Sequence, residues 1–243
     1  MNKIIHKADE RGEAEHGWLH SRHSFSFAEY YNPEKMGFGL LRVLNDDIVE
    51  PGMGFGTHPH NNMEIISIVI DGAIEHKDSM GTGSVIYKDD VQVMSAGTGV
   101  THSEFNHSKT AIVNFLQLWI FPKEKNIKAH YDQKSFPEKN RINKLITAVS
   151  GDEKKSALYI HQNAEIDLGI FKKDNAVKRK VSFSGNGLYI FVTEGKIDVD
   201  GEVVNKKDAV GLTGITEIKI EALKDSKFII VEVPLDNNLQ DTD

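Results

Sequence analysis

Two short islands of the sequence carry the residue types that bind transition metals. The first contains His58 and His60 with one residue between them, and the second, further along the chain, contains His102 and Glu104 with the same gap. Side chains alternate across a β-strand, so the two members of each pair would share a face in an extended backbone. Three imidazoles and a carboxylate form a suitable ligand set for a divalent transition metal. We therefore predict a metal site built from both islands.

The residues alone leave the fourth ligand open. Glu64 lies four positions after His60, so on one continuous strand it would face the same way as both histidines of the first island. Glu104 stands in a matching relation to His102, two positions away. Spacing does not separate these two carboxylates, and both are candidates at this point.

Four other histidines receive weaker expectations. His76 and His107 lie near predicted strand ends and could stand behind the site or at its rim, but lone histidines at such positions are more often solvated. His20 and His23 lie in a stretch where phenylalanines and serines alternate, and we expect them to be structural or to line a pocket wall.

The chain around the islands divides into short strands. The stretch 63–70 is apolar and β-branched and ends at an Asp-Gly turn, and the glycine-rich run 96–99 can turn the chain into the strand that carries His102. Strands at this spacing, broken by Gly and Asp and without a long helix between them, predict an all-β sandwich or barrel. The expected strands are 3–6, 38–46, 63–70, 73–76, 84–87, 91–95, 114–121, 144–149, 156–162, 178–183, 187–192, 196–199, 217–221 and 227–233.

An internal repeat indicates two copies of one β domain. The stretch around Gly72 resembles the stretch around Gly195, and each is followed by a Lys-Asp step into another apolar strand. Counted back from these glycines, the positions of the two histidines of the first island correspond to Val181 and Phe183. No histidine occurs after His161. We therefore predict that the second copy buries apolar side chains where ligands would be and holds no metal.

The expected domain boundaries follow from this repeat and from a polar, lysine-rich stretch between the copies. Residues 1–122 form an N-terminal domain with the metal site, 123–144 form a linker with a short helical turn, and 145–236 form a C-terminal domain without a metal site. Residues 237–243 are expected to be a frayed tail.

Composition excludes several classes of function. The 243 residues carry a net charge of −7 and no long basic run, which disfavours direct nucleic-acid binding. There is no cysteine, so disulfides, thiolate metal sites and cysteine nucleophiles are excluded. The N-terminus lacks the apolar core of a signal peptide, and no run is long enough to span a membrane. We expect a cytoplasmic monomer.

The two islands resemble the two cupin motifs, G-x5-H-x-H-x3,4-E-x6-G and G-x5-P-x-G-x2-H-x3-N. The first motif begins at Gly52 and closes at Gly72, one residue late. In the second motif Ala96 stands at the proline position, whereas His102 and Asn106 match. More specifically, the RHSFSF stretch that starts at residue 22, the HPHNNMEI stretch and the stretch 91–104 resemble the pirin family, over nearly the whole chain.

The resemblance implies a bicupin fold, with two jelly-roll sandwich domains in tandem and metal in the N-terminal domain only. Its ligands would be His58, His60, His102 and Glu104, with Glu104 also acting in catalysis, and Glu64 would be a nearby core group. The cofactor would be one divalent transition metal, with iron as the first choice and nickel, copper, manganese or zinc as alternatives.

The resemblance also implies an activity, because bacterial members of the family are associated with quercetin 2,3-dioxygenase. The substrates would be a flavonol-like aromatic and dioxygen, and the heterocycle would open with loss of carbon monoxide. Glu104 would accept the proton of the flavonol hydroxyl. One alternative is a non-enzymatic metal-binding redox or stress sensor that acts through a protein partner. A further alternative is a cupin isomerase or decarboxylase.

Overall fold

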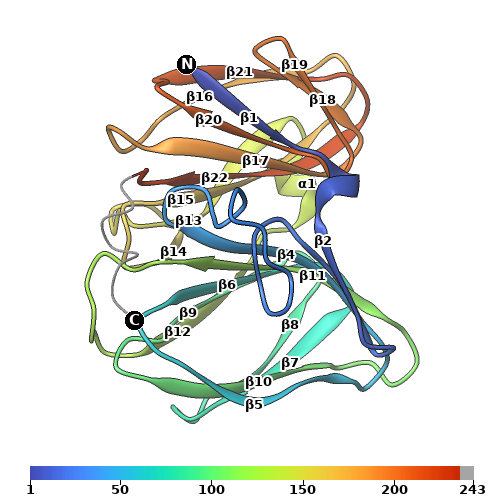
Figure 1. Ribbon diagram of the computed structural model, residues 1–243, viewed down its shortest axis with the longest axis vertical. Coiled ribbons are helices and arrows are strands. Elements are labelled where there is room, and N and C mark those ends of the chain that lie inside the picture. Colours follow the sequence, from blue (N-terminus) through green and yellow to red (C-terminus); the bar gives the residue numbers. More distant parts are fainter. Residues whose placement is uncertain (236–243) are drawn as a thin grey trace.

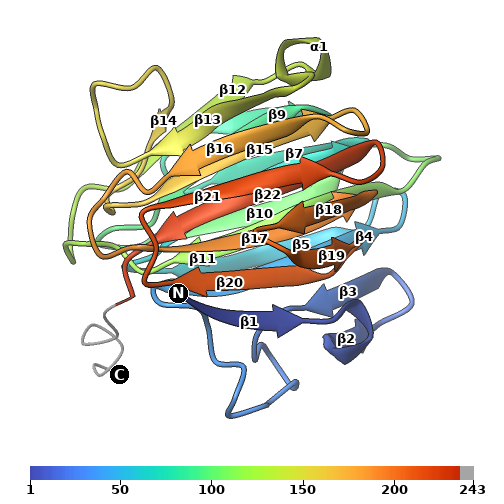
Figure 2. The same cartoon turned by 90° about the horizontal axis from the view of Figure 1, so that it is seen from above.

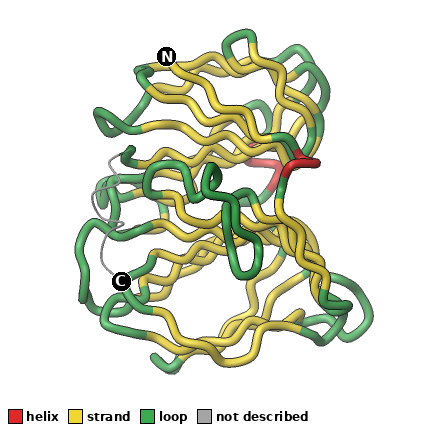
Figure 3. The backbone as a smooth tube through the Cα atoms, in the orientation of Figure 1, coloured by secondary structure: helices red, strands yellow, loops and turns green. Residues whose placement is uncertain are grey.

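The computed structural model describes residues 1–235 and contains two β domains stacked one above the other (Figure 1). Each domain has one seven-stranded sheet and one four-stranded sheet. Nearly all of the described chain is strand or loop (Figure 3). The prediction of two antiparallel β domains in tandem is confirmed. The expected frayed tail, residues 237–243, lies outside the described residues.

The first half of the chain supplies most of one domain. Its elements are the 3-10 helix η1 (Ala8–Glu10) and the strands β2 (Gly12–Glu15), β3 (Leu19–His23), β4 (Leu41–Val49), β5 (Gly54–His60), β6 (Glu64–Asp71), β7 (Ala73–Asp78), β8 (Gly83–Tyr87), β9 (Asp90–Ser95), β10 (Val100–Asn106), β11 (Val113–Ile120) and β12 (His130–Ser135). The large sheet has the order β12-β9-β6-β11-β4-β3-β2, and the small sheet has the order β5-β10-β7-β8.

The second domain repeats this arrangement. Its elements are α1 (Glu138–Arg141), β13 (Lys144–Ser150), β14 (Leu158–Tyr159), β15 (Glu165–Phe171), β16 (Ala176–Lys180), β17 (Gly187–Glu194), β18 (Lys196–Val199), β19 (Glu202–Asn205), β20 (Ala209–Thr213), β21 (Glu217–Ala222) and β22 (Ser226–Val233), together with β1 (Asn2–His6) from the start of the chain. The sheet orders are β1-β20-β17-β22-β15-β13-β14 and β16-β21-β18-β19. The internal repeat is therefore a repeat of topology as well as of sequence.

The structure departs from the expected domain boundaries at two edge strands. β1 pairs with β20 of the second domain, with Asn2 opposite Thr213 and His6 opposite Ala209 (Figure 2). β12, inside the expected linker, pairs with β9 of the first domain. The two strands occupy equivalent edges of the two large sheets. Pairing at a sheet edge is set by which strand is available in space, so sequence neighbourhood did not predict it.

The two large sheets face each other across the main apolar core. Ile66 and Leu118 of the first domain and Leu168 and Ile229 of the second lie in one buried cluster. Burial of each such side chain contributes about 2 kcal/mol, so this layer holds the domains together. The described part of the chain has no helix long and apolar enough to cross a membrane.

Candidate metal centre

The first domain brings both sequence islands to adjacent strands of its small sheet. β5 and β10 pair antiparallel, with His58 opposite His102, and the register shifts before Glu104, which pairs with Phe55. β5 therefore carries one extra residue, a β-bulge of the kind that re-aims side chains next to functional sites. A Cβ on Gly54 would lie only 2.3 Å from the carbonyl oxygen of Glu104, so only glycine permits this close approach.

A glycine turn delivers the second island to β10, as predicted. Gly97 has a φ of +49°, and a Cβ there would lie 2.1 Å from the carbonyl oxygen of Ile127. The Gly99 N–H donates to the carbonyl of Ala96 at 2.9 Å and closes the turn. The turn thus depends on a residue without a side chain, and His102 lies three residues after its end.

The three predicted histidine ligands form one cluster. Ring centroids are 4.5 Å apart for His58 and His102, 4.9 Å for His58 and His60, and 5.0 Å for His60 and His102. One nitrogen from each ring lies within 4.8 Å of the others. A bond between zinc and a histidine nitrogen is about 2 Å long, so two nitrogens bound to one ion lie at most about 4 Å apart. The three nitrogens can therefore converge on a single ion with modest side-chain movement.

Two of the imidazoles, those of His60 and His102, are held in the neutral form that metals bind. Burial, assisted by neighbouring imidazoles, lowers the pKa of His60 to about 4 and that of His102 to about 3. The Nδ1 of His58 lies 2.7 Å from the carbonyl oxygen of Gly56, so a proton on Nδ1 leaves Nε2 free as a ligand. Both ring nitrogens of His102 are buried and have no hydrogen-bond partner among the described residues. A metal ion fits these unpartnered atoms.

Glu104 is buried beside the cluster and is fixed from two sides. Ser67 Oγ donates to its Oε1 at 3.0 Å, and Gln117 Nε2 donates to its Oε2 at 2.7 Å. Glu104 and His102 also form a second possible metal-binding group with His76, which is fully buried and lies 3.1 Å from a carboxylate oxygen of Asp78. Hence His76 lies behind the site and not in solvent.

The interpretation that Glu64 could share a face with the histidines is wrong. Glu64 begins β6 in the large sheet, after a turn that separates it from His60 at the end of β5 in the small sheet. The alternation of side chains along β5 therefore does not continue through that turn into β6. The carboxylate accepts a hydrogen bond from Ser95 at 2.7 Å and shares its side of β6 with Ile66, in the core between the domains.

In the second domain, the residue at the position of His58 is not the one that counting back from Gly195 predicts. We aligned the two domains at Gly72 and Gly195 and followed the pairing of the strands from there. Ile218 then takes the position of His102, and Arg179, which lies opposite Ile218, takes the position of His58. The connection from β16 to β17 spans 181–186, whereas that from β5 to β6 spans only 61–63. Equal offsets therefore miss the equivalent residue, and an arginine, not an apolar side chain, stands there.

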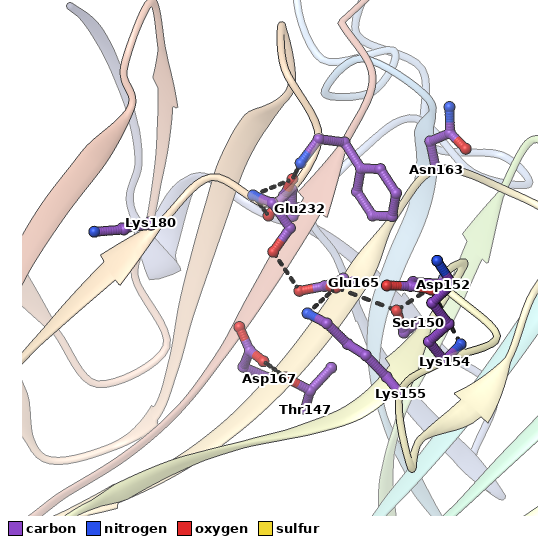
Figure 4. Close-up of polar contacts among 12 residues, drawn as sticks. Thr147, Ser150, Asp152, Lys154, Lys155, Asn163, Glu165, Asp167, Lys180 and Glu232 are labelled. Atoms are coloured by element: carbon purple, nitrogen blue, oxygen red, sulfur yellow. Dashed lines mark hydrogen bonds and ion pairs between the residues drawn. The ribbon is translucent and has the colours of Figure 1, made fainter.

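Arg179 is surrounded by three buried carboxylates. Its guanidinium lies 2.9 Å from Glu165, 2.6 Å from Asp167 and 3.0 Å from Glu232. Burial alone would lower the pKa of Arg179, but Asp167, Glu232 and Glu165 outweigh it and raise that pKa. Figure 4 shows the three carboxylates close together, with Lys155 in contact with Glu165. The second domain thus carries an internal cation where the first has its candidate metal centre.

A cavity of about 310 Å³ opens beside the histidine cluster and includes Glu104 in its wall. Aromatic side chains make much of the lining, namely Trp18, Phe27, Phe55 and Trp119. The His60 ring meets the Trp119 ring edge-on, with centroids 4.8 Å apart. Such a space suits a flat aromatic ligand.

Several polar residues of this region were not singled out from the sequence. Ser67 and Gln117 fix Glu104, and Asn45 and Asp47 line the cavity. Ser67 and Gln117 each interrupt an apolar strand, and Asn45 and Asp47 flank Asp46 in a polar run within β4. These polar positions were the available signal. Of the weaker candidates, His23 lines the cavity as expected.

Two other histidines lie outside the site. His20 pairs with Glu15 on the surface at 3.0 Å. His107 is exposed and lies 3.5 Å from Glu75.

Known proteins match this chain over nearly its full length. A family model described as Pirin matches residues 5–120, and one described as the quercetinase C-terminal cupin domain matches residues 147–233. A quercetin 2,3-dioxygenase of Escherichia coli strain K12 is 39% identical over 95% of this chain and 98% of its own length. The chain belongs to the pirin family.

Solved pirin structures share the fold as well. The crystal structure of YhhW from Escherichia coli is 38% identical, with a TM-score of 0.91 over 96% of this chain and 98% of that one. A second structure, of the bacterial pirin YhhW in complex with nickel(II), matches with the same TM-score of 0.91 over 96% and 99% of the two chains. The resemblance to bicupin pirins is thereby confirmed.

Proposed function

We propose that this pirin is a metal-dependent dioxygenase that opens the heterocycle of quercetin or a similar flavonol with release of carbon monoxide. The observation that carries the proposal is the cluster of three imidazoles, with ligand nitrogens within 4.8 Å, at the wall of an aromatic-lined cavity of about 310 Å³. The relatives named quercetin 2,3-dioxygenase support the same reaction.

The residues of the site would divide the work. His58, His60, His102 and Glu104 would hold the metal, which when bound would supply Lewis acidity toward the flavonol hydroxyl and the means to activate dioxygen. Glu104 accepts the proton of that hydroxyl at a carboxylate oxygen. The hydrogen bond from Gln117 holds one carboxylate oxygen of Glu104 in place. The aromatic cavity wall orients the flat substrate and excludes water from it.

Iron is the first metal to test, and nickel is the second because YhhW has been crystallised with nickel(II). We further propose that the protein is cytoplasmic and monomeric. Size-exclusion chromatography with light scattering will check the monomeric state.

The metal assignment is tested by elemental analysis of freshly isolated protein. We expect about one transition-metal ion per chain in the wild type and a large loss in His58→Ala and Glu104→Ala. His107→Ala is the matched control, because His107 is exposed and lies outside the site. Full metal content in both site variants would contradict the proposed ligands.

The reaction is tested with protein prepared anaerobically and loaded with one metal at a time. On admission of air, flavonol absorbance should fall and carbon monoxide should appear in matching amounts, in the wild type and in His107→Ala but not in Glu104→Ala. Bound metal with no flavonol consumed for any metal would refute the dioxygenase and favour the metal-sensor alternative.

A further inference from the structure

A row of polar side chains crosses the inner face of the first domain's large sheet. The strand registers place Ser67 opposite Gln117, Gln117 opposite Asn45, and Asn45 opposite His23. The inner members, Ser67 and Gln117, hold Glu104. The row therefore runs from the candidate metal centre across β11, β4 and β3 to the outer part of the cavity.

His23 and Asn45, at the outer end of this row, form a polar wall of the cavity together with the neighbouring cross-strand pair Ser21 and Asp47. The wall consists of Ser21, His23, Asn45 and Asp47, with Ser21 opposite Asp47 in the ladder. All four are at least nine-tenths buried, with exposed fractions of 1%, 3%, 2% and 4%. Strands lie about 4.8 Å apart, so His23 stands roughly 10 Å from Gln117, a separation that linked aromatic rings can span.

Two of the four side chains have a polar atom without a partner among the described residues, namely His23 Nδ1 and Asn45 Oδ1. Burial raises the pKa of Asp47 to about 7, although a hydrogen bond from Ser21 opposes the shift. A buried polar atom left unpaired costs about 1–3 kcal/mol, and two of them beside a buried carboxyl on one cavity wall indicate that a polar ligand group meets them there. The oxygens of Asn45 and Asp47 can accept only, unless the carboxyl is protonated, so they match O–H donors.

We propose that Ser21, His23, Asn45 and Asp47 form a second subsite that binds hydroxyl groups at the end of the substrate remote from the metal. The inference rests on the proposed function, which places the enol end of the substrate at the histidine cluster. It narrows the substrate class to flat aromatics with a metal-binding enol at one end and hydroxyl groups at the other. The aromatic side chains between the two ends hold the rings.

The test is equilibrium binding without oxygen, using metal-loaded protein. The probes are three flavonols with no, one or two hydroxyl groups on the pendant phenyl ring. We expect wild-type affinity to rise with the number of hydroxyl groups, by about tenfold or more between the extremes. Asn45→Leu, which keeps the side-chain volume but removes the acceptor, should flatten this gradient. Asp47→Asn should reduce it, and serves if Asn45→Leu does not fold.

Phe55→Leu is the control within the same cavity, because it removes ring contact without touching the polar wall. It should weaken all three flavonols by the same factor and leave the gradient unchanged. Equal wild-type affinity for the three probes, no binding of any, or an unchanged gradient in Asn45→Leu and Asp47→Asn would overturn the subsite. A gradient in binding with no turnover in air would keep the subsite and refute the dioxygenase, so the two failures are distinguishable.

Discussion

At the scale of single residues, the chemistry of the site depends on how Glu104 is held. Ser67 and Gln117 come from two neighbouring strands of the large sheet, whereas Glu104 comes from the small sheet that faces it. Both oxygens of the carboxylate are engaged, so hydrogen bonds alone fix its rotamer. Partners of this kind orient ligands and tune their affinity.

Removal of the Gln117 hydrogen bond should weaken the metal centre without unfolding the domain. For Gln117→Leu we expect a 10- to 100-fold loss of metal affinity, measured by competition with a chelator of known affinity. Gln92→Leu is the matched control, since Gln92 lies in the same cross-strand row but has no hydrogen bond to Glu104. Equal losses in the two variants would show that the effect is general to the sheet.

At the scale of elements, β5 and β16 show two ways to fill the same place in one fold. β5 presents histidines that can hold a removable cation, and β16 presents Arg179, a permanent cation. In the second domain the cation comes with its counter-charges, Glu165 and Asp167 from β15 and Glu232 from β22. Arg179 thus balances part of the charge of these buried carboxylates.

Loss of this internal cation should be costly. Arg179→Met would leave three buried carboxylates facing one another, and we expect a fall of about 3–5 kcal/mol in the free energy of unfolding. Arg22→Met, which breaks the half-exposed pair with Glu13, should cost no more than about 1 kcal/mol. Chemical denaturation monitored by fluorescence measures both, and similar small effects would refute a structural role for the buried cluster.

At the scale of the whole molecule, the two large sheets share a core that also contains a carboxylate. Glu64 is 1% exposed in this layer, and burial raises its pKa from 4.5 to about 7, although hydrogen bonds from Ser95 and the His161 backbone oppose the shift. The folded protein therefore binds the Glu64 proton more tightly than the unfolded chain does. Its contribution to stability is full below pH 4.5 and is lost as the pH rises toward 7.

The Glu64→Gln variant should lack this pH dependence. Near pH 4 we expect it to match the wild type, and by pH 8 it should be more stable by up to about 3 kcal/mol, because the wild type must then bury a charge. Denaturation curves from pH 4 to 8 will measure this, with Glu34→Gln at an exposed position as the control. A constant difference across the range would contradict the raised pKa.

The sequence by itself determined the parts of this protein that depend on local pattern. Alternating apolar residues predicted most strands, glycine turns marked their ends, and the two one-residue gaps selected His58, His60 and His102, which the structure brings together. The pattern did not predict β15, because Glu165, Asp167 and Gly169 interrupt its apolar residues. The two acidic interruptions, Glu165 and Asp167, become explicable only beside Arg179.

Only the tertiary structure decided what depends on contacts between distant strands. It separated Glu64 from Glu104, because the two carboxylates lie in different sheets and face different cores. It placed β1 in the second domain, since an open sheet edge accepts a strand from anywhere in the chain. It put Arg179 where counting predicted an apolar residue, because strand register, and not sequence offset, fixes which side chains share a barrel interior.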